Sequence, residues 1–204
     1  MKIKLMLTVF IAFFILGITV YCHAEDKERE IDGLYITKPE VVILNSPVTV
    51  TNKMTLDDIK PVDRLLFVET RIKRYECKTW NEVLTLHTSN SIKQLDELEG
   101  KKYFEEHKKN KDPQEYGFSF VSYVSCKQNG DDIIITQSVP WELKDADYNS
   151  YSFFMLSGYR KVGNQWKIDG TLLSSKLAAI IVSTPPVKLQ ETIDNWWEDL
   201  ESEE

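Results

Sequence analysis

The segment YGFSFVSYVSCKQNGDDIIITQSVP, residues 116–140, decides the fold. Its first half alternates between apolar and polar side chains, which is the period of a strand with one buried face. We expect that face to hold Phe118, Phe120, Val124 and Cys126. Asn129-Gly130 gives the strongest hairpin signal in the chain, because both residues tolerate the positive φ of a type I′ turn. Such a turn pairs Cys126 with Ile133 and keeps the register through Val139.

A second hairpin is expected further along the chain. Tyr151 to Val162 is rich in aromatic and β-branched residues and reads as a long strand. Gly163-Asn164 then supplies another two-residue turn, and the chain returns through residues 166–169 toward Leu173. This turn pairs Val162 with Gln165, Lys161 with Trp166, and Tyr159 with Ile168. The two hairpins predict about four antiparallel strands.

Helical signals precede these strands. Pro61 suits a first helical position, and the residues after it repeat an apolar side chain every three or four positions. That apolar face holds Val62, Leu65, Val68, Ile72 and Tyr75. Thr79-x-x-Glu82 and Ser91-x-x-Gln94 are capping boxes for two further short helices, and Gly100 is the expected end of the last one. Helices followed by antiparallel strands predict an α+β domain.

We expect the residues before and after the predicted α+β domain to form separate segments. We divide the chain into a leader at 1–24, an extended arm at 25–54, the core at 55–175 and a C-terminal segment at 176–204. In the arm, Val41–Leu44 and Val48–Thr51 flank the turn residues Asn45-Ser46-Pro47. This pattern predicts a small hairpin or two edge strands.

Residues 1–24, MKIKLMLTVFIAFFILGITVYCHA, have the features of a secretory signal. Two lysines precede an apolar run, and Cys22-His23-Ala24 resembles a cleavage site. We expect export, most naturally to a bacterial periplasm, with no stable membrane insertion after cleavage. The alternatives are an uncleaved membrane anchor and a lipoprotein modified at Cys22.

The chain is acidic, with 25 basic and 32 acidic residues. Removal of the leader, which holds two lysines, leaves a net charge of −9. Such a charge argues against nucleic acid or an anionic membrane as a partner. Residues 191–204 hold seven of the acids and no lysine or arginine, so the acidity is concentrated at the C-terminal end.

Two cysteines, Cys77 and Cys126, remain after the leader. In an oxidising compartment we expect one disulfide between them, which would close a loop of 50 residues. On the chain-entropy model, such a bridge would stabilise the fold by about 4 kcal/mol. Two separate buried thiols are the alternative.

Three segments together resemble the NTF2-like superfamily of exported domains. They are Cys77–Leu86, the Asn129-Gly130 hairpin and YRKVGNQWKID at 159–169, within a resemblance that spans about residues 60–175. The resemblance implies a curved sheet cupped against helices around a cone-shaped cavity, which serves catalysis, ligand binding or protein contact in different members. The paired His and Asp that its enzymes usually place in the cone are not found in this sequence, which favours a non-enzymatic role.

Candidate pocket residues are aromatic side chains that would line such a cone, unless they form the core instead. They are Trp80, Phe118, Phe120, Tyr151, Phe153 and Tyr159. His87 and Asp169 would form an acid–base dyad if the second helix packs over the last hairpin; the alternative is a surface histidine. No metal-ligand spacing or phosphate-binding loop occurs, so no metal or cofactor is predicted.

The C-terminal segment contains an amphipathic helix over 187–200. Its apolar face holds Leu189, Ile193, Trp196, Trp197 and Leu200, with acids opposite. This segment is either a solubilising tail or a recognition surface for a basic protein. For the second case, the predicted contact residues are Trp196, Trp197, Glu198, Asp199 and Glu201.

Two functional hypotheses follow. The first is a non-enzymatic periplasmic protein-binding domain, most concretely an immunity-type inhibitor that neutralises a secreted antibacterial effector by occluding its active site. The second is an NTF2-like small-ligand-binding or enzyme domain with an aromatic cone-shaped pocket.

Overall fold

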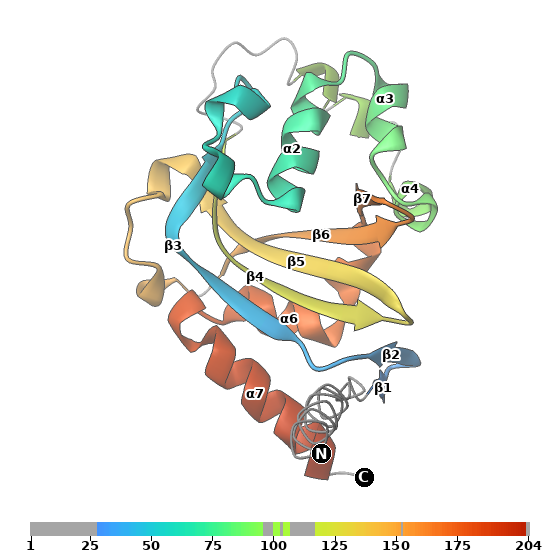
Figure 1. Cartoon of the computed structure of the whole chain (residues 1–204), viewed down its shortest axis with the longest axis vertical. Helices are drawn as coiled ribbons and strands as arrows, with labels where there is room; N and C mark the ends of the chain where they lie inside the picture. The colour runs from blue at the N-terminus through green and yellow to red at the C-terminus, as the bar shows by residue number, and fades with distance from the viewer. Residues whose placement is uncertain (1–27, 96–99, 103, 107–116, 152, 203–204) are drawn as a thin grey trace, which may run out of the picture.

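The computed structural model describes residues 28–95, 100–102, 104–106, 117–151 and 153–202. The expected leader at 1–24 lies outside these residues. The described chain forms an α+β fold around a curled antiparallel sheet (Figure 1). Its strands are β1 (Arg29–Ile31), β2 (Leu34–Ile36), β3 (Glu40–Val50), β4 (Phe118–Gln128), β5 (Asp131–Pro140), β6 (Met155–Val162) and β7 (Gln165–Ile168). The sheet order is β1-β2-β4-β5-β6-β7, with β3 also paired to β4, so the sheet is larger than the predicted four strands.

The β4–β5 hairpin turns at Asn129-Gly130, as predicted. Asn129 has φ 51° and Gly130 has φ 84°. Cys126 lies opposite Ile133, which confirms the register near the turn. The register shifts between Phe120 and Ser122, because Val121 is an extra residue in β4.

This bulge at Val121 corrects the prediction that one apolar face runs along all of β4. Phe118 and Phe120 face α2, whereas Val124 and Cys126 belong to the cluster on the opposite side of the sheet. A single extra residue exchanges the faces of a strand, since the side-chain period is two.

The β6–β7 hairpin has the predicted pairs, including Tyr159 with Ile168. Its strands are shorter than expected, because β6 begins at Met155 and the chain after β7 forms the 3-10 helix η6 (Gly170–Ser174). Asp169 ends the strand by capping η6, with its carboxylate accepting from the Thr171 backbone N–H at 3.2 Å.

The N-terminal arm adds three strands to the sheet. β3 is one strand along β4 and not a hairpin, since Ile43 pairs with Ser122 and pairing resumes at Val48 with Phe120. The turn residues between them form an irregularity within the strand. The arm's hairpin lies earlier, between β1 and β2, where Asp32 and Gly33 take φ values of 54° and 79°. Asp-Gly is a standard hairpin signal, so this turn was predictable from the sequence although it was not predicted above.

The helices are α2 (Leu66–Glu76), α3 (Trp80–Thr85), α4 (Ser89–Gln94), α6 (Lys176–Ser183) and α7 (Pro186–Ser202). Short 3-10 helices also occur: η1 (Leu56–Asp58), η2 (Pro61–Asp63), η4 (Trp141–Leu143) and η5 (Tyr148–Ser150). Pro61 therefore opens a 3-10 turn, and the long helix begins later than predicted because Leu65 is extended.

The capping predictions have mixed outcomes. Thr79 caps α3 as expected, accepting from the Glu82 backbone N–H at 3.2 Å. The cap of α4 is Thr88 and not Ser91, because Thr88 comes one turn earlier and its hydroxyl accepts from Ser91 N at 3.1 Å. Gly100 does not end a helix, since residues 100–102 are themselves helical.

The helices cover both faces of the sheet (Figure 1). On one face α2 packs through Phe67, Val68 and Ile72. On the other, α6 and α7 pack through apolar side chains such as Ile181 and Ile193. The core therefore has two layers divided by the sheet.

This division explains why the predicted disulfide is wrong. Cys77 and Cys126 are not bridged to each other. Cys77 follows α2, where its Sγ donates to Lys73 O at 3.2 Å, while Cys126 packs in the cluster of α6 and α7. The sheet separates the two side chains, so the alternative of two separate thiols holds. Burial raises the pKa of Cys126 to about 12.

Candidate functional site

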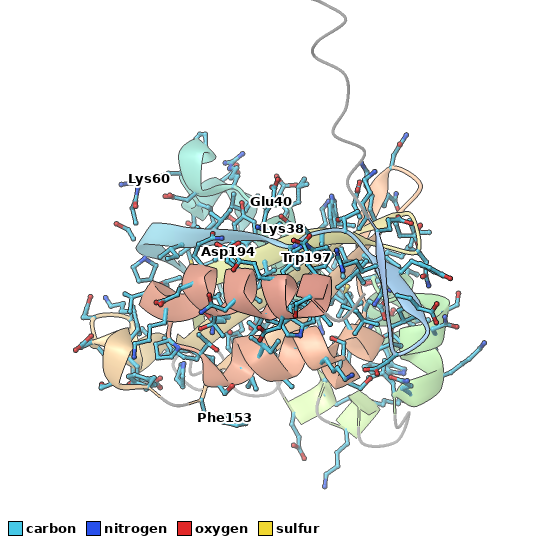
Figure 2. The ribbon with its side chains drawn as sticks, turned by 90° about the horizontal axis from the view of Figure 1, so that it is seen from below. Lys38, Glu40, Lys60, Phe153, Asp194 and Trp197 are labelled. Carbon is cyan, nitrogen blue, oxygen red and sulfur yellow. The ribbon has the colours of Figure 1, made fainter. Side chains whose placement is uncertain are left out.

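The six predicted pocket aromatics do not come together. Phe120 and Tyr159 are fully buried beside Phe67, at ring-centroid distances of 5.1 and 5.9 Å, and so belong to the core. Trp80 packs against Phe104. Phe118 lies on the same face of β4 as Phe120, against the Arg71 guanidinium. Tyr151 packs beside Phe154, and Phe153 is 73% exposed and projects from the body (Figure 2).

His87 and Asp169 are brought to the same region. The chain after α3 packs on β7, since Thr88 N donates to Ile168 O at 2.9 Å and Ile168 N donates to Leu86 O at 2.7 Å. The segment after the second predicted helix therefore packs on the last hairpin, which was the condition for an acid–base dyad of His87 and Asp169.

The hydrogen bonds of this region nevertheless pair each group with other residues. The His87 ring, through Nδ1, lies 3.4 Å from Ser91 Oγ. Asp169 Oδ1 accepts from Thr88 Oγ1 at 3.2 Å and from Thr171 Oγ1 at 2.6 Å, while Oδ2 accepts from Arg160 Nε at 2.7 Å. Both carboxylate oxygens therefore already accept hydrogen bonds, and within the described residues no hydrogen bond joins Asp169 to the His87 ring.

The pKa values of these groups follow from burial and charge. Burial, helped by Arg74 and Arg71, lowers the pKa of His87 to about 4, so the ring is neutral at pH 7. Burial alone would raise the pKa of Asp169, but the hydrogen bonds from Arg160 and Thr171 outweigh it and hold that pKa below its ordinary value. Asp169 is therefore an ionised partner for Arg160.

Arg160 connects three parts of the fold. Besides Asp169, its guanidinium donates from Nη1 to Asp131 Oδ2 at 3.2 Å and from Nη2 to Gln128 Oε1. The guanidinium thus ties β6 to both sides of the β4–β5 turn. Sequence reading did not identify Arg160, because the pairing of β5 with β6 brings it there and no local pattern marks it.

A cavity of about 680 Å³ opens beside Arg160. Its walls come from the β1–β2 hairpin, the β4–β5 turn, the start of α4 and the start of α6. This volume lies within the range of small-molecule sites. None of the six predicted pocket aromatics lines it, whereas Trp196 of α7 does.

The C-terminal helix α7 is packed firmly on the domain. Leu189 and Ile193 are fully buried, and Trp197 is 3% exposed. The Arg29 guanidinium lies over the Trp197 ring at 5.4 Å from its centroid, and Arg29 Nη1 donates to Leu200 O at 2.9 Å. The segment is therefore an integral helix and not a loose tail.

Two ion pairs add to this packing. Lys38 Nζ lies 2.9 Å from Asp194 Oδ1, between α7 and the chain that leads into β3 (Figure 2). Arg29 Nη2 lies 3.2 Å from Glu201 Oε1. Lys38 and Asp194 are partly exposed, so their pair contributes only about 0–1 kcal/mol.

The predicted partner-binding residues thus separate into two groups. Trp197 is inside the fold and is not available to a partner, and Trp196 is half-buried. Glu198, Asp199 and Glu201 are exposed, although Glu201 is paired with Arg29.

Comparison of this chain with protein-family models, curated proteins and solved structures finds no match. Within the described residues, none of the helices has the length and apolar character needed to cross a membrane.

Proposed function

We propose that this chain is an exported, non-enzymatic protein-binding domain, most concretely an immunity-type inhibitor that neutralises a secreted antibacterial effector by occluding its active site. The observation that carries the proposal is the outer face of α7. Glu191, Glu198 and Asp199 are exposed there, and none of the three forms an ion pair within the described part of the chain. We name these three residues the acidic face.

The acidic face is held in place before any partner arrives. Glu191 and Glu198 are seven residues apart, so they lie on the same side of the helix. The opposite side of α7 is fixed by Leu189, Ile193 and Trp197. A rigid surface loses little conformational entropy on binding, which favours affinity.

Charge of one sign on such a surface speeds encounter with a basic partner. The partner we propose is therefore a protein with a basic surface around its active site. Inhibition would follow from covering that site, and it requires no reacting group on this chain.

The experiment uses the effector that co-purifies with the protein from envelope extract. The triple variant Glu191→Gln, Glu198→Gln, Asp199→Asn should slow association about tenfold at low salt and flatten its salt dependence, because it removes the steering charge. The measurement is surface plasmon resonance over a salt series, together with the residual activity of the effector.

A matched control removes three exposed acids elsewhere: Glu76→Gln, Glu105→Gln and Glu142→Gln. It changes the net charge equally but spares α7, and it should retain most of the association rate. Equal slowing in both triple variants would contradict a role for the acidic face, and an effector that stays active in the complex would contradict inhibition.

The second candidate is an NTF2-like small-ligand-binding or enzyme domain. The observation that favours it is the curled antiparallel sheet with helices, which is consistent with an NTF2-like cone. Against an open cone, Phe67 of α2 packs on Phe120 and Tyr159, the aromatics expected to line it. Protein binding therefore remains the preferred proposal.

A further inference from the structure

We propose that the cavity beside Arg160 binds a neutral oligosaccharide. It lies on the side of the sheet that α6 and α7 cover, away from the cone expected from the resemblance, and it shares no residue with the acidic face. The inference therefore stands independently of the protein-binding proposal.

Part of the cavity lining is apolar. Ile31 and Ile36 come from the β1–β2 hairpin, Ile133 from β5 and Leu177 from α6. Trp196 completes this apolar lining. It packs against two clusters, one that contains Ile133 and Leu177 and one that contains Ile31 and Ile36. An indole flanked by aliphatic side chains suits the C–H face of a sugar ring, which is flat and apolar.

Hydrogen-bonding groups lie beside these apolar side chains on the sheet, since Gln128 pairs with Ile36 and Arg160 pairs with Ile133. Gln128 is 6% exposed, and its Oε1 accepts from Arg160. Its Nε2 has no hydrogen-bond acceptor in the described part of the chain, although the residue lines the cavity. Three of the five N–H groups of Arg160 are used, which leaves two donors.

The mouth of the cavity adds Ser89 and Asn90 at the start of α4, both exposed. Among the residues described, neither side chain takes part in a hydrogen bond. An amide offers both donors and an acceptor, and a hydroxyl does the same. Sugar hydroxyls, which also donate and accept, match this set.

The charges of the lining favour a ligand without charge. Lys176 Nζ lies 3.0 Å from Asp32 Oδ1, and Arg160 is paired with Asp131 and Asp169. Each cation is already neutralised within the wall, and the lining carries one more acid than base. An anionic ligand would be repelled by this excess of negative charge, whereas a neutral polyol would not.

The test is isothermal titration of the purified protein with maltotriose, cellotriose and chitotriose. At least one trisaccharide should bind saturably. Asn90→Ala and Trp196→Leu should each weaken that binding about tenfold, by loss of a hydrogen bond and of the aromatic wall. Asn90 is exposed, so its variant should keep the parent melting temperature and reports binding even if the tryptophan variant is destabilised.

Matched controls lie outside the cavity. Asn195→Ala removes an exposed amide next to Trp196, and Trp166→Leu removes a half-buried indole on β7. Both should leave trisaccharide affinity unchanged. The proposal is overturned if none of the three trisaccharides binds, if Asn90→Ala binds as tightly as the parent, or if octanoate or inorganic phosphate binds at this cavity in their place.

Discussion

Replacement of Trp197 by alanine should destabilise the whole domain. The indole packs against Ile31, Ile36 and Leu200, so it joins the last helix to the first hairpin. Truncation of a buried tryptophan to alanine costs about 3–5 kcal/mol through lost transfer energy and an unfilled cavity. Loss of the cation–π contact with Arg29 adds about 0.5–2 kcal/mol.

We therefore expect the free energy of unfolding to fall by about 4 kcal/mol, a large part of the roughly 5–15 kcal/mol of a typical domain. The melting temperature should fall by about 8–16 °C, given about 2–4 °C per kcal/mol for a chain of this size. The assay is urea unfolding followed by circular dichroism, with a thermal scan alongside it.

Asn195→Ala is the matched control, because Asn195 is exposed on the same helix and should change stability by less than about 0.5 kcal/mol. Trp197→Phe keeps an aromatic ring and should lose less than the alanine variant. A loss below about 1 kcal/mol for Trp197→Ala would refute the packing of α7 on the N-terminal hairpin.

Two further predictions concern the region around Asp169. Gly158→Ala would place a Cβ 2.5 Å from Asp169 O, so we expect a loss of about 1–3 kcal/mol in urea unfolding, and parent-like stability would contradict this close approach. The pKa of His87 is about 4 in the fold against 6.5 for the free group, so the unfolded chain takes up the proton first as pH falls. Stability should therefore be lost from about pH 6.5 down to about 4, by about 2 kcal/mol at pH 5. His87→Gln should lack this part of the pH dependence, and an unchanged pH profile would exclude a buried neutral His87.

The sequence by itself determined the local features of the fold. Asn129-Gly130 and Gly163-Asn164 fixed two hairpins and their first pairs, because turn residues and neighbouring strands lie within a few positions of each other. The Thr79 cap and the amphipathic face of the last helix were predictable for the same reason.

Only the tertiary structure decided how these pieces combine. The bulge at Val121 reversed the faces of β4, and the sheet placed Cys77 and Cys126 on opposite sides, although composition and compartment favoured a bridge. Arg29 and Trp197 are far apart in the chain, and their contact depends on the long-range docking of α7.

The candidate site likewise depends on tertiary packing more than on local sequence. Its cavity is formed by residues from β1 through α7, and Arg160 reaches it through strand pairing across the sheet. Such contacts carry no local periodicity, because they arise when distant segments bury their apolar faces together. The sequence therefore determined the elements, and the burial of their apolar faces determined the site.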